Sequence, residues 1–385
     1  MLSRDHQPHA ESRRPLTFWV ISDLHYLSPR LYLPDSASFQ SLLQRNDGKM
    51  IEQMPSILEA LQRLAECKKP DAILIPGDLT LNGEYQSLLD LRECLRQIQG
   101  IGIELLVIPG NHDIDFQRAA DLTKDAAVPV KSISQNDFAE VMHDFGPSQA
   151  RACAADSFSY IYEAAPDLWI MALDANSEHA RGEISCETRR WAEHMLDLAA
   201  NHHIHVITMT HQNLIPQSRY FMKDYVVHNH EEVQRVLMNG GVALNLSGHS
   251  HLQHTSVSGP LTDICTECAA VYPLSFGELA VSAGRTHAVY SRRLFEVDRS
   301  ESKKRLAMTI TRMVAPSVEH PDIPSDAQKR MLDFAREVAV PFYTGDLNDS
   351  SLYIHSPEWD LWKTYAGSTF WGEYIETILT EFMHE

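Results

Sequence analysis

The 385 residues, of which 44% are hydrophobic and 22% charged, have a composition typical of globular proteins, and their number predicts a large domain with a small second one. No apolar run approaches the roughly 20 residues of a membrane-spanning helix, which argues against membrane insertion. The formal net charge of −19 argues against tight binding of long nucleic acids, which needs a surface rich in lysine and arginine.

The N-terminal residues 1–15 are polar and predict a flexible tail. No apolar stretch that could serve as the core of a signal peptide follows Arg13 and Arg14, so we expect a cytoplasmic protein. In that compartment the six scattered cysteines stay reduced. The pair Cys265 and Cys268 lacks the second pair of a zinc site, and we interpret it as structural.

Short apolar runs alternate with longer amphipathic segments in the first two thirds of the chain. The runs predict strands at residues 18–21, 72–75, 104–108, 168–173, 205–209 and 242–246. The segments between them carry apolar residues at helical spacing, for example Leu88, Leu91 and Leu95 before the third run. This alternation is typical of an α/β protein.

The pattern changes after residue 278. Alternating apolar residues predict strands at 286–290, 294–297 and 306–313, joined as hairpins. A turn-rich link follows, and helical patterns appear at 326–340, 359–365 and 371–383. We therefore predict a large domain over residues 16–315 and a small C-terminal helical domain over residues 316–385, which either caps a site or mediates a homo-oligomer.

Potential metal ligands and their polar neighbours follow five of the apolar runs. They are Asp23, His25, Asp78, Asn111, His112, Asp113, His211, His249 and His251. In an open α/β sheet the ligand crevice lies at the carboxyl ends of the strands, so these side chains are expected to converge. Residues two apart in extended chain point to one side, so each D-x-H or H-x-H pair could grip an ion. Glycines precede several of them and let the backbone turn there: Gly77, Gly110 and Gly248.

Two further segments are long or polar enough to border such a site. They cover residues 113–156 and 220–232. Within the second, we interpret His228 and His230 as surface histidines before a helix.

The ligand set also predicts the metals. Carboxylate and imidazole ligands favour Mn, Fe or Zn over Mg and Ca, which prefer oxygen ligands. Seven ligands are too many for one ion and predict two. Two ions roughly 3.5–4 Å apart can clamp a phosphate and acidify a bridging water to a pKa of about 7, which makes it a nucleophile. Such cations allow a small anionic substrate in an acidic protein.

The motifs D-x-H, G-D, G-N-H-D, H and G-H-x-H follow one another between Asp23 and His251. In this order they resemble the calcineurin-like metallophosphoesterases. The resemblance covers about two thirds of the chain and implies a four-layer αββα sandwich over residues 16–315. It also implies two transition-metal ions, with Mn or Fe favoured. Asp23, His25 and His251 would bind one ion, Asn111, His211 and His249 would bind the other, and Asp78 would bridge them.

The resemblance implies roles for the two residues that complete the G-N-H-D motif. His112 would protonate the leaving oxygen or stabilise the charge of the transition state. Asp113 would orient the imidazole of His112.

Details of the motifs distinguish branches of this family. The segment 77–83, Gly-Asp-Leu-Thr-Leu-Asn-Gly, and the final Asp113 differ from the G-D-x-x-D-R-G and G-N-H-E motifs of the protein serine/threonine phosphatases. The histidine two residues after Asp23, the compact G-H-S-H box and the C-terminal helices are similar to class III cyclic-nucleotide phosphodiesterases and their bacterial relatives.

This similarity implies hydrolysis of small phosphodiesters, 3′,5′-cyclic nucleotides above all, by attack of a metal-bridging hydroxide. One alternative is a phosphomonoesterase or a phosphodiesterase of broad specificity, acting on nucleotides or lipid head groups. A second alternative is a non-catalytic scaffold. Scaffold relatives lose ligands or the histidine of G-N-H, whereas this chain keeps all of them.

Overall fold

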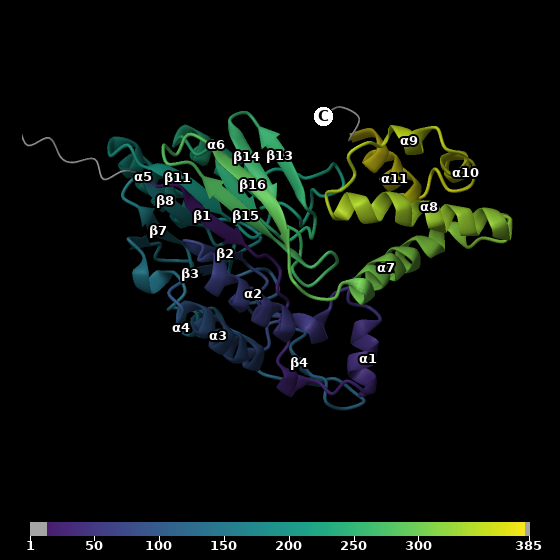
Figure 1. Ribbon diagram of the computed structural model, residues 1–385, viewed down its shortest axis with the longest axis horizontal. Helices are drawn as coiled ribbons and strands as arrows, with labels where there is room; N and C mark the ends of the chain where they lie inside the picture. The colour runs from purple at the N-terminus through teal and green to yellow at the C-terminus, as the bar shows by residue number, and fades with distance from the viewer. Residues whose placement is uncertain (1–13, 382–385) are drawn as a thin grey trace, which may run out of the picture.

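The computed structural model describes residues 14–381 and contains two large β-sheets that lie face to face. Helices cover the outer face of each sheet, and five further helices follow at the C-terminal end (Figure 1). The predicted four-layer αββα sandwich with C-terminal helices is confirmed. Residues 1–13 of the predicted tail lie outside the described residues.

The first sheet has the strand order β16-β15-β1-β2-β3. Its strands are β1 Leu16–Val20, β2 Ala72–Pro76, β3 Glu104–Ile108, β15 Ser275–Val281 and β16 Ala288–Leu294. β1, β2 and β3 are parallel, and the hairpin of β15 and β16 pairs antiparallel with β1. The covering helices are α2 Met54–Lys68, α3 Tyr85–Gln99 and α4 Gln135–Val141. Their apolar faces pack on the sheet, as in α2, whose Ile57, Leu58 and Leu61 are buried.

The second sheet has the strand order β13-β14-β12-β11-β8-β7-β6. Its strands are β6 Ala152–Cys153, β7 Tyr160–Ala165, β8 Leu168–Ala172, β11 His205–Met209, β12 Leu244–Ser247, β13 His254–Ser258 and β14 Leu261–Cys265. The four central strands β8, β11, β12 and β14 are parallel. The helices α5 Cys186–Asn201 and α6 His230–Asn239 cover its outer face.

Successive side chains of β8 alternate between the two hydrophobic cores of the sandwich. Leu168 and Ile170 belong to the core between the sheets, whereas Trp169 and Met171 belong to the core under α5 and α6. All residues of β8 are buried, so the strand has the nearly continuous apolar sequence of a strand covered on both faces.

Short elements lie in the loops at the carboxyl ends of the strands. They are α1 Ala37–Leu43, β4 Ala120–Asp121, β5 Val128–Pro129, β9 Asn176–Ser177 and β10 Ala180–Arg181, with one-turn 3₁₀ helices at Pro29–Leu31, Ile51–Gln53 and Pro147–Gln149. The segment 113–156 thus contains short strands and α4, as its length indicated.

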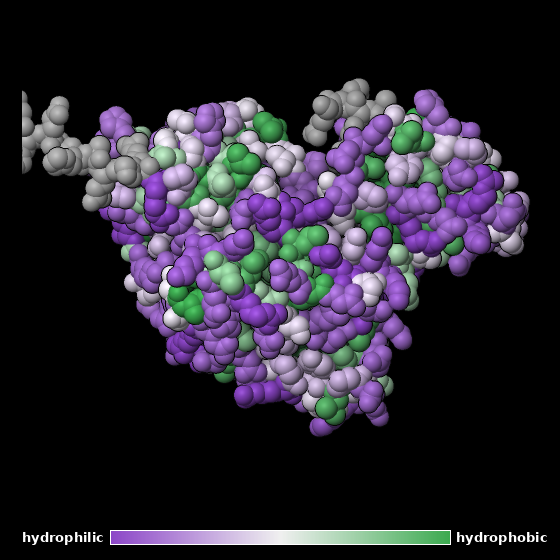
Figure 2. Space-filling model, viewed as in Figure 1, coloured by the Kyte–Doolittle hydropathy of each residue, from purple (hydrophilic) through white to green (hydrophobic). Residues whose placement is uncertain are grey.

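The C-terminal helices pack against the same core as the first sheet. They are α7 Ser300–Val318, α8 Ser325–Tyr343, α9 Ser351–Ile354, α10 Pro357–Tyr365 and α11 Phe370–Glu381. The surface of these helices, like most of the face in Figure 2, is hydrophilic. No helix within residues 14–381 is long and apolar enough to cross a membrane.

Two predictions for the segment after residue 278 were wrong. A single strand, β16, replaces the strands predicted at 286–290 and 294–297. The strand predicted at 306–313 belongs to α7, because Leu306, Ile310 and Val314 recur every four residues and are buried on one side of a helix. Met308 gave the segment its alternating pattern, but its side chain is 69% exposed. Since α7 crosses residue 316, strands give way to helices near residue 300.

We expect Trp362→Ala to weaken the C-terminal helices strongly. Trp362 is fully buried in α10, and its indole N–H donates to the backbone carbonyl of Met331 in α8 over 3.0 Å. Loss of such a side chain lowers the free energy of unfolding by about 3–5 kcal/mol. Urea denaturation followed by circular dichroism measures this change. Tyr365→Ala, on the same helix but 41% exposed, is the control and should have a much smaller effect. Equal effects of the two substitutions would contradict the packing described.

Candidate metal centre

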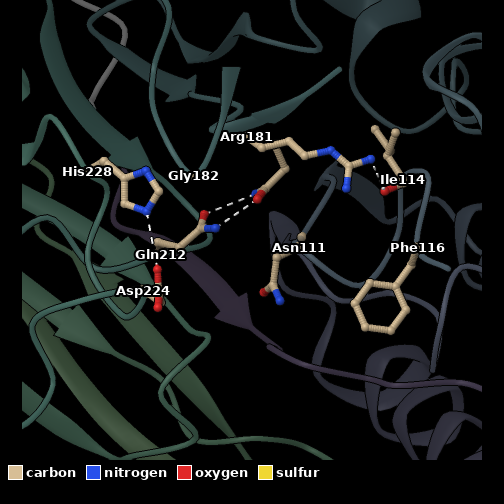
Figure 3. A pocket seen from close by; sticks show the side chains of 10 residues that line it. Asn111, Ile114, Phe116, Arg181, Gly182, Gln212, Asp224 and His228 are labelled. Atoms are coloured by element: carbon tan, nitrogen blue, oxygen red, sulfur yellow. Dashed lines mark hydrogen bonds and ion pairs between the residues drawn. The ribbon is translucent and has the colours of Figure 1, made fainter. Parts of the chain in front are cut away.

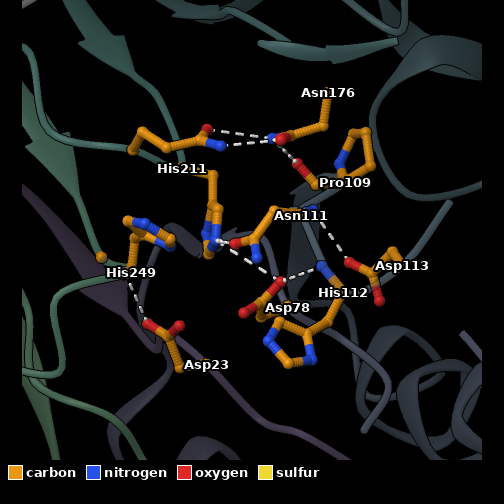
Figure 4. Close-up of polar contacts among 12 residues, drawn as sticks. Asp23, Asp78, Pro109, Asn111, His112, Asp113, Asn176, His211 and His249 are labelled. Atoms are coloured by element: carbon orange, nitrogen blue, oxygen red, sulfur yellow. Dashed lines mark hydrogen bonds and ion pairs between the residues drawn. The ribbon is translucent and has the colours of Figure 1, made fainter. Parts of the chain in front are cut away.

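The seven predicted ligands lie together at the carboxyl ends of five strands. Figure 4 shows Asp23, Asp78, Asn111, His211 and His249 among them. They follow β1, β2 and β3 of the first sheet and β11 and β12 of the second, so the site lies where the two sheets meet. Asp23, His25, Asp78 and His211 are buried. The side chains form two groups with Asp78 between them.

The first group consists of Asp23, His25 and His251. The Nε2 atoms of His25 and His251 lie 3.1 Å apart, and Nε2 of His251 lies 3.3 Å from Oδ1 of Asp23. The other carboxylate oxygen of Asp23, Oδ2, accepts the O–H of Ser22 and the backbone N–H of His249. Oδ1 is buried and has no hydrogen-bond partner. Asp23 therefore directs one unpaired oxygen toward two histidine nitrogens.

The second group consists of Asn111, His211 and His249. Nε2 of His211 lies 2.9 Å from Oδ1 of Asn111, and His249 offers a ring nitrogen within 4.8 Å of the ligand atoms of His211 and Asp78. The two rings lie with their centroids 4.9 Å apart.

Asp78 faces both groups with different oxygens. Its Oδ2 lies 3.6 Å from Nε2 of His25, and its Oδ1 lies 3.4 Å from Nε2 of His211. Burial raises the pKa of this carboxyl, but the surrounding His211, His112 and His25 hold that pKa well below its usual range. The carboxylate is therefore ionised and lies where a bridging ligand would lie.

These distances fit two metal ions. Ligand atoms at neighbouring positions around one ion, each about 2.1 Å from it, lie roughly 3.0–3.4 Å from one another. The distances of 3.1 Å between His25 and His251 and of 3.3 Å between His251 and Asp23 agree with this spacing. Oδ1 of Asp23 supports the same conclusion, because a buried carboxylate oxygen that accepts no hydrogen bond is costly.

Backbone carbonyls orient the two histidines of the second group. Nδ1 of His211 donates to the carbonyl of Pro76 over 2.7 Å, and Nε2 of His249 donates to the carbonyl of Asp224 over 2.8 Å. A carbonyl only accepts, so each of these nitrogens carries the hydrogen, and Nε2 of His211 and Nδ1 of His249 are left for a metal. Asp224 was not among the predicted site residues, although it lies in the predicted rim segment 220–232.

The two imidazoles titrate in opposite directions. Burial lowers the pKa of His211, but Asp78 outweighs it and raises that pKa to about 9. Burial, with a further contribution from His211, lowers the pKa of His249 to about 4. The acidic groups thus attract one positive charge to this position, and a metal ion can supply that charge instead of a proton.

Five of the seven ligands have positive φ angles. The values are 56° for Asp23, 43° for His25, 51° for Asp78, 67° for His249 and 56° for His251. The ligand pairs are therefore not extended, and our explanation of why Asp23 and His25 point to one side was wrong, although the residues converge. Left-handed turns aim these side chains instead. At Gly110 a Cβ atom would collide with the backbone nitrogen and the carboxylate of Asp78, which explains the glycine there.

The predicted role of Asp113 requires a correction, because its carboxylate does not contact the ring of His112. It accepts hydrogen bonds from the backbone N–H groups of Leu79, Thr80 and Gly110. The carbonyl of Leu81 orients the ring instead, by accepting from Nδ1 of His112 over 2.8 Å. The short side chain of Asp113, directly behind two ligand loops, reaches their backbone before it reaches the imidazole.

A second buried carboxylate, that of Asp263, supports the ligand loops of the second sheet as Asp113 supports those of the first. Asp263 in β14 accepts the backbone N–H groups of Leu214 and Ile215, after His211, and the O–H of Ser247, before His249. No pattern in the sequence indicates this role, since Asp263 lies inside an otherwise ordinary strand.

Two pockets adjoin the candidate ligands. The smaller pocket, about 240 Å³, is lined by Asn111, Phe116, Arg181, Asp224 and His228 among others (Figure 3). The larger one, about 700 Å³, is lined by His112 and by residues of the segments 37–49, 81–84 and 118–127. Both predicted rim segments contribute to them. His228, interpreted as a surface histidine, is half exposed, but it lines the smaller pocket and lies 3.6 Å from the carboxylate of Asp224.

Cys268, which we interpreted as structural, lies beside the first group. Its Sγ lies within 4.8 Å of the ligand nitrogens of His25 and His251, and its S–H donates to the backbone carbonyl of Asp23. Burial raises the pKa of this thiol above the ordinary value, so it stays protonated. The thiol thus packs beside the first group and supports the turn at Asp23.

Comparison with known proteins agrees with this geometry. A 45-residue segment is 56% identical to a protein of Ruthia magnifica subsp. Calyptogena magnifica described as a probable cyclic nucleotide phosphodiesterase, and it spans 12% of this chain and 18% of that protein. The fold is similar to that of a dimetal phosphatase from Danio rerio, with a TM-score of 0.50 and 13% identity over 71% of this chain and 98% of the other. The family model of the calcineurin-like phosphoesterases matches residues 16–253, more than half of the chain. The chain belongs to the calcineurin-like phosphoesterase family.

Proposed function

We propose that this chain is a dinuclear metal-dependent phosphodiesterase that hydrolyses small phosphodiesters, 3′,5′-cyclic nucleotides in particular. The observation that carries the choice of a diester is the pair of pockets, one lined by the proposed ligand Asn111 and the other by the neighbouring His112. A phosphodiester has two ester groups to place, one on each side of the phosphorus atom. The larger pocket, about 700 Å³, is of the size of small-molecule sites. The short similarity to a probable cyclic nucleotide phosphodiesterase supports the same substrate class.

In this proposal the first group would hold one metal ion, the second group would hold the other, and the carboxylate of Asp78 would serve both. The mixed set of imidazole, carboxylate and amide ligands suits Mn, Fe or Zn, and of these we propose Mn or Fe. When bound, the ions supply the positive charge that neutralises the phosphoryl group and makes a water nucleophilic.

His112 is the proposed proton donor for the leaving ester oxygen. Its Nδ1–H donates to the carbonyl of Leu81, so Nε2 is free for the substrate and carries a proton to donate when the ring is an imidazolium. Two contacts fix the ring: the backbone N–H of His112 donates to Asp78 over 2.9 Å, and the ring of Phe116 stacks on it with centroids 4.5 Å apart. An imidazole held this way on the wall of the larger pocket can exchange a proton with an ester oxygen there.

Asp113 is a positioning residue in this proposal. It fastens the turn after Asp78 to the loop before Asn111 through the backbone hydrogen bonds described above. The positions of a bridging ligand and of a ligand from the second group thus depend on one buried carboxylate.

The first test combines metal analysis with turnover. Elemental analysis of the purified chain should find two transition-metal ions, and chelation should abolish hydrolysis of bis(p-nitrophenyl) phosphate and of 3′,5′-cyclic AMP. Addition of Mn should restore both activities. Hydrolysis of p-nitrophenyl phosphate in preference to the diester would favour the phosphomonoesterase alternative, and hydrolysis of the reporter without cyclic nucleotides would favour broad specificity.

His112→Ala should lower kcat for the diester roughly 10²- to 10⁴-fold, the usual contribution of a positioned acid or base, while the metal content stays at the wild-type value. The metal content is preserved because His112 is not among the proposed ligands. His194→Ala, an exposed histidine of α5, is the control. A loss of metal together with activity would show that His112 is a ligand and not the proton donor.

Asp113→Asn should weaken both stability and metal binding. The substitution places an amide N–H₂ among backbone donors, and each buried donor left without an acceptor costs about 1–3 kcal/mol. We expect a lower urea midpoint and roughly 10- to 100-fold weaker metal affinity, as for other residues that orient metal ligands. Competition with a metal-sensitive dye measures the affinity. If the variant matches Asp197→Asn, an exposed control on α5, Asp113 does not fasten the loops.

A further inference from the structure

Lys49 is a buried lysine on the wall of the larger pocket, which it shares with His112. It lies in a tight turn between α1 and the 3₁₀ helix Ile51–Gln53, where Asp47 and Gly48 have φ angles of 56° and 84°. Its side chain is only 8% exposed. Lysines are rarely buried to this extent without a partner, because an ammonium ion loses its hydration on burial.

The structure gives this ammonium group no close partner among residues 14–381. The nearest acid paired with it is Asp47, whose carboxylate lies 3.8 Å from Nζ and is mostly exposed. No hydrogen bond to Nζ accompanies this ion pair, so its contribution is small. A buried cation that borders a cavity and has no close counter-ion is suited to an anion that enters the cavity.

Lys49 and His112 line the same pocket. The ammonium group and the proposed proton donor therefore border one cavity and can act on the same substrate.

Contacts from two directions keep the turn in place. The backbone N–H of Met50 donates to the carbonyl of Ala270 over 2.7 Å, and the side chain of Asn46 donates to the carbonyl of Lys49 over 2.8 Å. On its other side the turn packs against α7, where a Cβ atom at Gly48 would lie 3.4 Å from Cα of Leu306. The lysine is thus fixed toward the pocket before a substrate arrives, which lowers the entropy cost of binding.

The remaining charges of the pocket agree with an anionic ligand. Arg45 and Arg118, both exposed, line the same pocket, so three cations gather there in a chain of net charge −19. Asp47, Asp125 and Glu84 also line it. Burial raises the pKa of Glu84 to about 7, which leaves much of this carboxyl uncharged at neutral pH.

We propose that the Lys49 ammonium binds an anionic phosphoryl oxygen of the substrate in the pocket beside His112. Lys49 is then a substrate-binding residue that neither the motifs nor the family model single out. The proposal rests on the proposed function for the identity of the substrate. In this arrangement Lys49 and the metal ions would both bind the phosphoryl group, and Lys49 would lie on the side of the leaving group.

Calorimetric titration of inorganic phosphate into the metal-loaded full chain tests the proposal. Lys49→Met keeps the length of the side chain and removes the charge. It should weaken phosphate binding roughly 10- to 100-fold, the usual effect of losing a hydrogen bond to a charged group. KM for the diester should rise by a similar factor, with a smaller change in kcat. Lys49→Arg should restore part of the affinity, and Lys68→Met, an exposed lysine of α2, should match the wild type.

Phosphate affinity of Lys49→Met within twofold of the wild type, at equal metal content, would overturn the proposal. If the variant does not fold, the wild-type chain provides the second measurement. Phosphate should slow the acetylation of Lys49 by acetic anhydride several-fold, read by mass spectrometry, and leave Lys68 unaffected. Equal protection of both lysines, or of neither, would count against the proposal. Since phosphate binding is measured without turnover, absence of diester hydrolysis would refute the proposed function and leave the result for Lys49 intact.

Discussion

The site depends on keeping the carboxylate of Asp78 buried between two groups of histidines. A buried charge of this kind is stable only when opposite charge surrounds it closely. His211, whose pKa is raised to about 9, supplies that charge 3.4 Å from one oxygen of Asp78, and the imidazole of His25 lies 3.6 Å from the other oxygen. The two histidines come from different sheets. The packing of sheet on sheet therefore determines whether Asp78 has suitable neighbours, and the apolar core between the sheets serves the site directly.

The loops that carry the ligands are strained, and the scaffold compensates for the strain. Five ligands have positive φ angles, which non-glycine residues adopt at a cost of order 1–3 kcal/mol each. Rigid strands anchor these turns, because β1, β2, β11 and β12 are largely buried. Asp113 and Asp263 then fasten the turns from behind through backbone hydrogen bonds. The two carboxylates have matching tasks in the two sheets, so each half of the site has its own support.

The sequence predicted the elements that obey short-range patterns. Apolar runs that end in Asp, Asn or His located five strands and all seven proposed ligands, because burial and polarity change abruptly at a strand end. The prediction for the α7 segment was wrong. The exposed Met308 completes the alternating pattern of a strand, but tertiary contacts stabilise a helix there. Lys49, Asp224 and Asp263 act through contacts with residues distant in the chain, and no local pattern marks such contacts. The predicted role of Asp113 was wrong for a related reason. The hydrogen-bond donor that a carboxylate reaches depends on the geometry of the loops, which no local pattern shows.

The arrangement of the C-terminal helices bears on how they serve the site. The residues that line the two pockets beside the ligands all lie between residues 37 and 228, so the helices do not line either pocket. They contact the site indirectly, because Leu306 of α7 lies against Gly48 and Arg305 pairs with Glu52. Both contacts flank the turn that holds Lys49. The helices thus pack against the outer side of this turn, and the inner side of the turn faces the pocket. Support of the turn explains why they pack on the first sheet, without a role as a lid over the site or as a contact with a second copy of the chain.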